Sequence, residues 1–257
     1  RGMWGRGDAA SRPRVCLGGE GRALSATAIL WQSVKPLFGA ASITLEVLGL
    51  LLLVGLALGA VLAFTQTYGP RLLRYVCVGY EQLFRGIPPI VVLLFFWNGL
   101  LQPLHVPGVL VAAFALGLRS AAYQSQIFRG AILAVASGQM MAARSLGMSK
   151  IQSIRSVILP QALRLAIPPW ANEYSGVVKD TAFICVVGGL IDLMRQALLK
   201  VPTLAMRRPL GTNLILPYFI ILGLFYLVLT YAGNSLLILL ERRLRIPGFE
   251  LKGKVER

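Results

Sequence analysis

Long apolar runs separated by short polar connections make up most of this sequence. The clearest run, residues 43–64, contains 22 residues with Glu46 as its one charge. A helix of that length rises roughly 33 Å and can cross the hydrocarbon core of a bilayer, which is about 30 Å thick. Further apolar runs occupy residues 87–101, 108–127, 163–194 and 214–240. We therefore predict an all-α, polytopic membrane helix bundle with about five transmembrane helices.

Proline and glycine residues modify two of these runs. Pro88 and Pro89 stand at the entrance of the second run, after a helical approach over residues 72–84. Proline removes a backbone donor and clashes with the preceding turn, so a kink or a new helix is expected there. In the first run Gly55 and Gly59 form a G-x-x-x-G pattern. This pattern either lets another helix approach closely or reflects the high glycine content of membrane helices.

The composition agrees with a membrane protein and argues against a soluble enzyme. The chain is 56% hydrophobic and 14% charged, with a mean hydropathy of +0.69, whereas soluble domains carry about 25% charged residues. Lys and Arg outnumber Asp and Glu by 26 to 10, which gives a net charge of +16. These basic residues cluster between and beyond the apolar runs, as they do at the ends of membrane spans near anionic lipid. No fold signature for nucleic-acid binding accompanies the charge, so no nucleic-acid partner is expected.

Residue types that carry catalysis or bind metals are sparse. The cysteines are isolated from one another, and they are Cys16, Cys77 and Cys185. His105 is the single histidine, so neither a zinc site nor a Ser-His-Asp triad is expected. Residues 248–254 have the spacing of a P-loop, but a valine replaces the Ser or Thr that binds magnesium and no strand precedes them. We expect no enzyme activity, and no nucleotide, metal or other cofactor bound by this chain.

A polar island over residues 137–160 lies between the third and fourth apolar runs. Gly147 can adopt the left-handed conformation that closes a helix, and Ser149 with Gln152 has the spacing of a capping box. Two short helices with a break between them are therefore predicted, and Pro160 is expected to mark the end of the second helix or a kink. The apolar face of that helix is expected to consist of Ile151, Ile154, Val157 and Ile158. From the pattern alone, a connecting loop that lies on the membrane is the alternative.

This island resembles the E-A-A…G…I-x-L-P loop of permease subunits of type I ABC importers, through Ala142-Ala143, Gly147 and residues 158–160. The resemblance implies a coupling helix, which docks in a cleft of a cytoplasmic ATPase and passes its closing motion to the membrane helices. Met141 stands where the family usually has Glu. The residues that the resemblance assigns to ATPase coupling are Met141, Ala142, Ala143, Leu146, Gly147 and Pro160.

Three further stretches resemble the polar amino-acid subgroup of these permeases. They are residues 84–88, residues 122–131 with Gln126 in place of a Glu, and residues 172–183 with Lys179-Asp180-Thr181. A charge inside a membrane is costly unless it is paired or faces water. We therefore assign to a substrate pathway or an interhelical polar network Arg119, Gln126, Asn172, Glu173, Lys179 and Asp180. Structural ion pairs are the alternative to contact with cargo, and a helix shifted to bring Arg119 near one end is the alternative for that residue.

The resemblance implies an assembly in a prokaryotic cell (inner) membrane. The expected partners are the lipid bilayer, a second permease subunit that is the same or a sister chain, a cytoplasmic ABC ATPase dimer that carries ATP and Mg, and an extracytoplasmic substrate-binding protein. The expected function is ATP-driven import of a polar amino acid. An ion-coupled secondary transporter of a small polar solute is the rival hypothesis, because it too would use buried charges, although it usually shows an internal inverted repeat.

The composition divides the chain into three parts. Residues 1–33 are rich in Arg and Gly and are expected to be a disordered tail or an artefact. Residues 34–246 are expected to form the transmembrane permease domain, and residues 247–257 a basic cytoplasmic tail. If the coupling loop is cytoplasmic, several basic residues after the fourth run fall on the outer side, so the positive-inside rule is only partly obeyed.

Overall fold

The computed structural model describes residues 26–101, 104–206 and 213–244, and every regular element in these residues is a helix. The α-helices are α1 (Ala26–Tyr68), α2 (Arg71–Gly86), α3 (Pro89–Leu94), α4 (Gly108–Ala134), α5 (Ser137–Ser145), α6 (Lys150–Ser153), α7 (Leu159–Asp180), α8 (Leu193–Met206) and α9 (Ile215–Leu244). The π-helical segments are Phe95–Leu101 and Ile154–Ile158, and the 3₁₀ segment is Thr181–Val186. The all-α prediction is confirmed.

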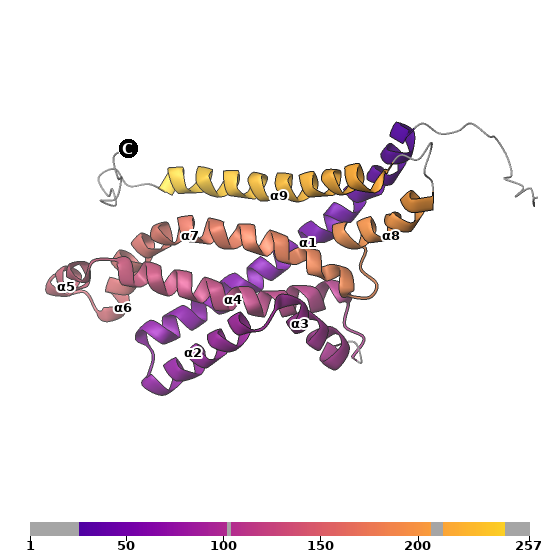
Figure 1. Cartoon of the computed structure of the whole chain (residues 1–257). Helices are drawn as coiled ribbons and strands as arrows, with labels where there is room; N and C mark the ends of the chain where they lie inside the picture. The colour runs from indigo at the N-terminus through magenta and orange to yellow at the C-terminus, as the bar shows by residue number, and fades with distance from the viewer. Residues whose placement is uncertain (1–25, 102–103, 207–212, 245–257) are drawn as a thin grey trace, which may run out of the picture.

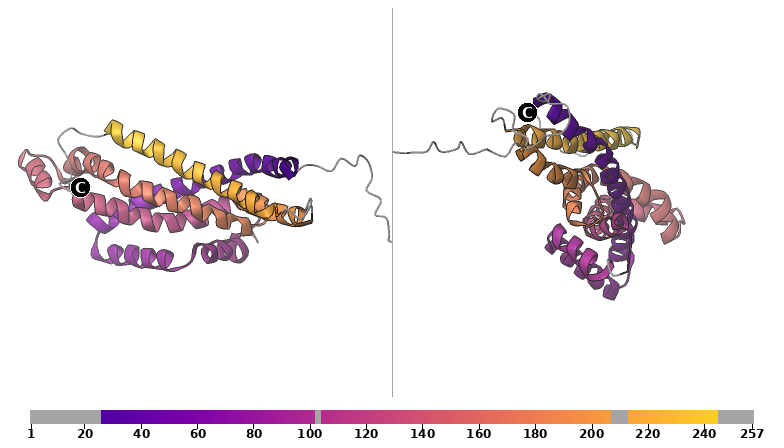
Figure 2. Two further views of the ribbon diagram at one scale, coloured as in Figure 1. Left: turned by 45° about the horizontal axis from the view of Figure 1, so that its top comes forward. Right: turned by 90° about the vertical axis from the view of Figure 1, so that its right-hand side faces the viewer.

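The long helices α1, α4, α7 and α9 are gathered in one bundle (Figure 1). Helix α4 packs against α1 and α7, and α9 packs against α7. The hairpin of α5 and α6 projects at one end of the bundle, while α8 lies near the other end (Figure 2). The largest hydrophobic core lies between α1, α3, α4 and α7, and includes Leu51, Leu93, Leu116 and Val178. Helices α1, α4 and α7 therefore each contribute one face to a shared core.

Helix α1 is longer than the apolar run that predicts it. It begins at Ala26, and Ile29 and Val34 are already buried in a second core with α8 and α9. The predicted span 43–64 lies within this helix. The tail expected over residues 1–33 therefore overlaps α1, because residues 26–33 are helical. Residues 1–25 lie outside the described part of the chain, as does the predicted tail 247–257.

Glycines allow α1 and α4 to pack closely. A Cβ atom on Gly59 would lie 3.0 Å from Cβ of Gln124 and 3.1 Å from the carbonyl oxygen of Ala121, both on α4. From the other side, a Cβ on Gly117 would lie 2.7 Å from Cγ1 of Val54. A side chain at either position would force its neighbours on the other helix to shift, so the G-x-x-x-G pattern of Gly55 and Gly59 marks a helix contact.

The second apolar run is broken where two prolines follow each other. Ile87 and Pro88 both adopt extended conformations, because the ring of a following proline disfavours the helical region. The two resulting pieces, Arg71–Gly86 and Pro89–Gly99, differ in direction by 103° and are long and apolar enough together for one broken span. The predicted approach and kink are confirmed.

The described helices fit about five membrane spans. By length and hydropathy α1 and α9 could each cross a membrane alone, and the broken pair of α2 and α3 could form a third span. Helices α4 and α7 contain 27 and 22 residues and rise roughly 40 and 33 Å, which is also sufficient. They are less apolar because they carry polar and charged side chains, among them Arg119 and Gln124 on α4 and Glu173 on α7.

The predicted fourth span, residues 163–194, ends earlier than expected. Helix α7 stops at Asp180, the chain continues as the 3₁₀ segment, and Gly189 has a φ of +82° that no α-helix accommodates. The hydroxyl of Thr181 donates to the carbonyl of Val178 at 2.6 Å, within the last turn of α7. The Lys179-Asp180-Thr181 segment therefore lies at a helix end and not inside a continuous span.

We expect Gly59→Val to loosen the contact between α1 and α4. The added side chain meets backbone and Cβ atoms of α4 that cannot rotate away, and such overpacking typically costs about 1–3 kcal/mol. Gly49→Val on the same helix is the matched control, because a Cβ there has no neighbour within 4 Å. Thermal unfolding of the detergent-purified chain should show a lower melting temperature for the first variant alone. Equal melting temperatures would contradict the close contact.

Candidate functional site

The polar island forms the projecting hairpin of α5 and α6. Gly147, with a φ of +81°, closes α5, and the amide of Met148 donates to the carbonyl of Ala143 at 3.2 Å. The amide of Ser149 donates to Oε1 of Gln152 at 2.8 Å, and the amide of Gln152 donates to Oγ of Ser149 at 3.3 Å. The predicted break at Gly147 and the capping box are therefore both confirmed.

Large apolar side chains are exposed on this hairpin. Met141 is 64% exposed, Leu146 81% and Ile151 77%, although large apolar side chains of this type are usually buried in a core. Ala142 is also exposed, whereas Ala143 is 3% exposed and lies inside the hairpin. An apolar surface of this kind typically marks an interaction site.

The predicted apolar face of the second short helix is wrong at Ile151, which points to solvent. Ile158 is buried, and Ile154 and Val157 are half-buried. The π-helical turn Ile154–Ile158 adds a residue to the local repeat, so the 3.6-residue period used for the prediction does not apply. The chain then continues directly into α7 through the exposed Pro160, which starts that helix and does not end one.

Arg119 and Asp180 form an ion pair between α4 and α7. Arg119 also lies with its guanidinium carbon 4.9 Å from the ring centre of Tyr123, and donates from Nη2 to the Tyr123 hydroxyl at 3.4 Å. It is the twelfth of the 27 residues of α4, so the alternative that it lies near a helix end is wrong. The cation is paired inside the bundle, as the cost of an intramembrane charge requires.

A second polar contact joins the same two helices. The hydroxyl of Ser120 donates to Oε1 of Glu173 at 3.0 Å. Nε2 of Gln124 donates to that hydroxyl at 3.1 Å, and Oε1 of Gln124 accepts from the indole of Trp170 at 2.9 Å. Glu173 and Asp180 thus find partners on α4, as expected from their unfavourable spacing relative to Lys179.

Glu81 on α2 is the centre of a third group, which sequence reasoning missed. Its carboxylate is 1% exposed and accepts hydrogen bonds from Gln66 of α1 and from Ser125 and Gln126 of α4. From the sequence, Gln126 is assigned to the polar network but its partner Glu81 is not. Glu81 lies in a stretch that also contains exposed polar residues, so its burial is not evident from the sequence. The available clue was one carboxylate in an otherwise strongly amphipathic helix.

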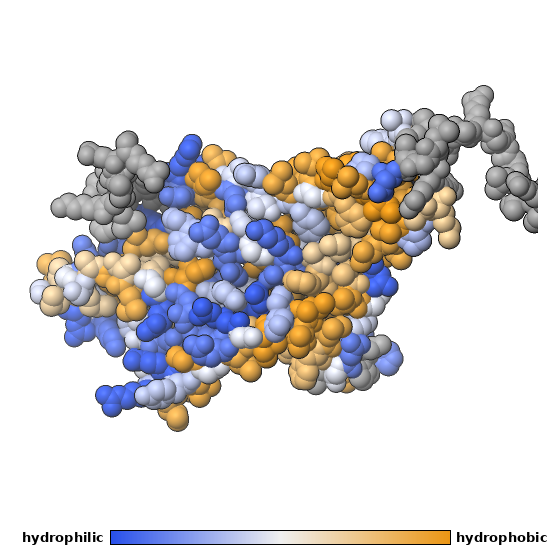
Figure 3. All heavy atoms as spheres, in the orientation of Figure 1, coloured by the Kyte–Doolittle hydropathy of each residue, from blue (hydrophilic) through white to orange (hydrophobic). Residues whose placement is uncertain are grey.

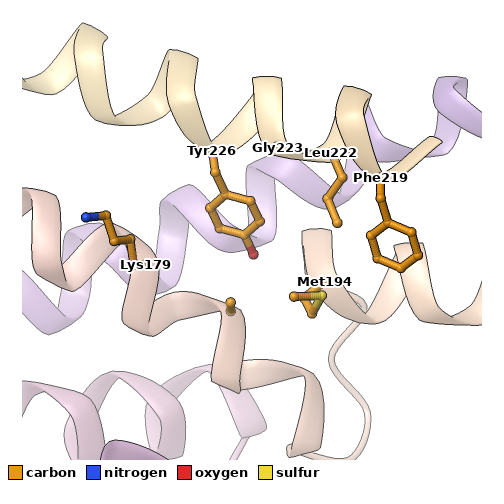
Figure 4. A pocket seen from close by; sticks show the side chains of 7 residues that line it. Lys179, Met194, Phe219, Leu222, Gly223 and Tyr226 are labelled. Carbon is orange, nitrogen blue, oxygen red and sulfur yellow. The ribbon is translucent and has the colours of Figure 1, made fainter. Parts of the chain in front are cut away.

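The remaining candidates, Asn172 and Lys179, are exposed on α7. Lys179 lines a pocket of about 280 Å³ at the packing of α7 against α8 and α9. The other lining residues are Ala182, Met194, Phe219, Leu222, Gly223 and Tyr226 (Figure 4). The structure therefore divides the candidates into paired side chains between helices and exposed ones that are open to solvent, lipid or a second subunit.

These features define a polytopic membrane protein with polar side chains paired inside a helix bundle and a hairpin projecting from it. The model of the family described as "binding-protein-dependent transport system inner membrane component" matches residues 55–246. The chain belongs to this family, whose members are transport permeases.

Individual relatives agree with the family match. The glutamine transport system permease protein of Escherichia coli strain K12 is 30% identical over 220 residues, which are 84% of this chain and 96% of that protein. The octopine transport system permease protein of Rhizobium meliloti is 33% identical over 72% of this chain and 79% of that protein. The resemblance to permease subunits of ABC transporters is thereby confirmed.

Solved structures also share the fold. A chain from the crystal structure of an amino acid ABC transporter with histidines has a TM-score of 0.70 and 31% identity, and the match covers 83% of this chain and 96% of that chain. A chain of an inward-facing methionine ABC transporter has a TM-score of 0.62 at 20% identity, over 85% of this chain and 98% of that chain. The second match supports the fold alone.

We expect Arg119→Met and Asp180→Leu each to destabilise the bundle, because either change leaves one charge without its partner. Breaking such a pair costs about 3–5 kcal/mol when it is fully buried, and these side chains are 17% and 21% exposed, so a smaller loss is expected. The double variant should melt at a higher temperature than either single variant. Lys179→Met, beside the pair but exposed, is the control. Losses that simply add would contradict the energetic coupling.

Proposed function

We propose that this chain is the membrane-spanning permease subunit of an ATP-driven importer of polar amino acids in a prokaryotic inner membrane. The observation that carries the proposal is the exposed apolar surface of the α5–α6 hairpin at one end of a membrane bundle. Family membership supports the transport role, and the names of the relatives support an amino acid as cargo.

In this proposal the hairpin docks on a cytoplasmic ATPase. Its contact surface consists of Met141, Ala142, Leu146 and Ile151, which are exposed and largely apolar. Ala143 and Gly147 act differently, since one packs inside the hairpin and the other permits its left-handed turn. Because Met141 replaces the family's usual Glu, the docking contact there is apolar and uncharged. Pro160 lies in the first turn of α7, which transmits the motion of the hairpin into the bundle.

The translocation path follows the polar side of α4 and α7. Hydrophilic residues extend from the hairpin end toward the middle of the visible face, whereas hydrophobic residues dominate the opposite end (Figure 3). A polar solute needs such a lining, because its passage through lipid alone leaves its hydrogen bonds unmade. Asn172, Glu173 and Lys179 are the candidate contacts with cargo, while Arg119, Asp180 and Gln126 hold the helices in register.

In the proposed assembly, partner proteins bind ATP and deliver the cargo. ATP and Mg bind to the ATPase partners, which form a dimer under two permease subunits, and a substrate-binding protein delivers the cargo from outside. The permease has no enzyme activity of its own in this scheme. The second permease subunit is either a copy of this chain or a sister chain, and the two subunits are related by a two-fold axis.

The rival function, ion-coupled secondary transport, draws support from the same buried charges. The hairpin argues against it, because a secondary transporter has no ATPase to dock and no need for exposed Met141, Leu146 and Ile151. Uptake by the permease alone in vesicles with an ion gradient would favour the rival. Uptake that requires ATP and the ATPase would favour the importer.

We expect Leu146→Glu and Ile151→Glu to release the ATPase from the detergent-solubilised complex. Each change places a charge in an apolar contact, and loss of a hot-spot contact costs about 2 kcal/mol or more, which is more than tenfold in affinity. Co-purification of the ATPase with the tagged permease measures the effect.

Met206→Glu is the matched control for this experiment. Met206 is 86% exposed and lies on α8, near the opposite end of the bundle from the hairpin (Figure 1). The control should retain the ATPase as the native chain does. Ala143→Glu is unsuitable as a test of docking, because Ala143 is buried and a charge at its position would disrupt the hairpin itself. Retention of the ATPase by both hairpin variants would contradict the docking role of the hairpin.

A further inference from the structure

Arg85 lies where the broken second span meets the centre of α4. It is the penultimate residue of α2, directly before the proline break. Its guanidinium carbon lies 5.2 Å from the ring centre of Tyr123, within the range of a cation–π contact. The Arg85 side chain is nevertheless exposed. One face of the guanidinium is therefore supported by protein while its donors remain accessible.

The depth of this contact follows from α4. Tyr123 is the sixteenth of the 27 residues of this helix, roughly 22 Å along the axis from its start and 17 Å from its end. Arg85 is therefore level with the middle of a span, where an unpaired cation is costly unless it faces water or binds an anion.

No acidic side chain in the described residues pairs with Arg85. The one ion pair there joins Arg119 to Asp180, which neutralises the second guanidinium over the same ring. Both oxygens of Glu81, one turn before Arg85 on α2, accept from amides or a hydroxyl of other helices. Arg85 thus has no carboxylate partner in the described residues, and Glu81, one turn away, is held by neutral donors of other helices.

A second donor at the same place also lacks a partner. Nε of Arg119 is buried and makes no hydrogen bond within the described part of the chain. A buried donor without an acceptor is unfavourable, and an oxygen from a ligand or water would satisfy it. Arg85 thus offers accessible donors to an oxygen-rich anion, and the unpaired donor of Arg119 lies enclosed beside the same ring.

The position of Arg85 is held from both sides. Glu81, four residues earlier on the same face of α2, ties that helix to α1 and α4 through its three hydrogen bonds. Tyr123 in turn is held by Arg119. A site built on such fixed elements requires little reorganisation when a ligand arrives.

We propose that Arg85, supported on the Tyr123 ring, binds the carboxylate group of the transported solute midway through the permease. The planar guanidinium suits a carboxylate because it can donate two parallel hydrogen bonds. This inference rests on the proposed import of amino acids and adds a site for one group of the cargo. Glu81 is a positioning residue for this site.

The test is direct binding to the permease–ATPase complex in lipid nanodiscs, without the substrate-binding protein. [³H]L-arginine and [³H]L-glutamine are the probes, and their α-carboxamides are the competitors. The native complex should bind a probe and prefer the free acid over the carboxamide by about tenfold or more. Arg85→Gln should weaken binding by a similar factor and abolish that preference, and Arg85→Lys should lose less of both.

Arg74→Gln is the matched control, since Arg74 is an exposed arginine on the same helix and makes no ring contact or ion pair in the described structure. Its affinity and preference for the free acid should equal those of the native complex. Co-purification of the ATPase checks that each variant is folded. If Arg85→Gln does not fold, the comparison of Arg85→Lys with Arg74→Lys decides the question in the same way.

Three results would overturn the carboxylate site. The first is an unchanged preference for the free acid in Arg85→Gln. The second is a native complex that binds neither probe although the full assembly imports one of them. The third is a variant that loses the second permease subunit while its preference is kept, since Arg85 would then belong to the subunit contact. Failure of the proposed function is distinguishable, because the full assembly would then show no ATP-dependent uptake of any polar amino acid, and this result would remove both proposals.

Discussion

The structure depends on one constraint, which is that a polar side chain inside a membrane bundle must find its partner on another helix. Helix α4 meets this constraint for α1, α2 and α7. Its side chains contact Gln66 on α1 through Ser125, Glu81 on α2 through Gln126, and Asp180 on α7 through Arg119. Since each of these contacts crosses between helices, the polar groups determine which helices lie together.

Close packing and polar pairing divide the surface of α4 between them. Its small residues allow α1 to approach through Gly55 and Gly59, while its longer polar residues reach α2 and α7. The first kind of contact excludes most side-chain adjustment, so α1 and α4 form a rigid pair. Helix α7 shares the apolar core with α4, is also joined to it by directional polar contacts, and begins immediately after the hairpin. Under the proposed function, α7 is therefore the element through which a displaced hairpin acts on the bundle.

The same constraint separates structural from functional polar residues. Glu81 and Ser125 are buried and fully occupied by each other and by neighbouring amides. Arg85, Asn172 and Lys179 are exposed, and no carboxylate of the described chain pairs with them. A charge that the fold leaves unpaired is available for a ligand, lipid or second subunit, whereas a paired one is committed to the fold.

The sequence alone determined the helical class, the break at Pro88 and Pro89, and the hairpin at Gly147, because these follow from local backbone chemistry and hydrophobic period. The tertiary structure decided the rest. The exposure of Ile151 depends on a π-helical turn that no period announces, and the end of α7 at Asp180 depends on packing beyond it. The partners of Glu81 and Arg119 lie tens of residues away in sequence, and only the folded chain brings those residues into contact.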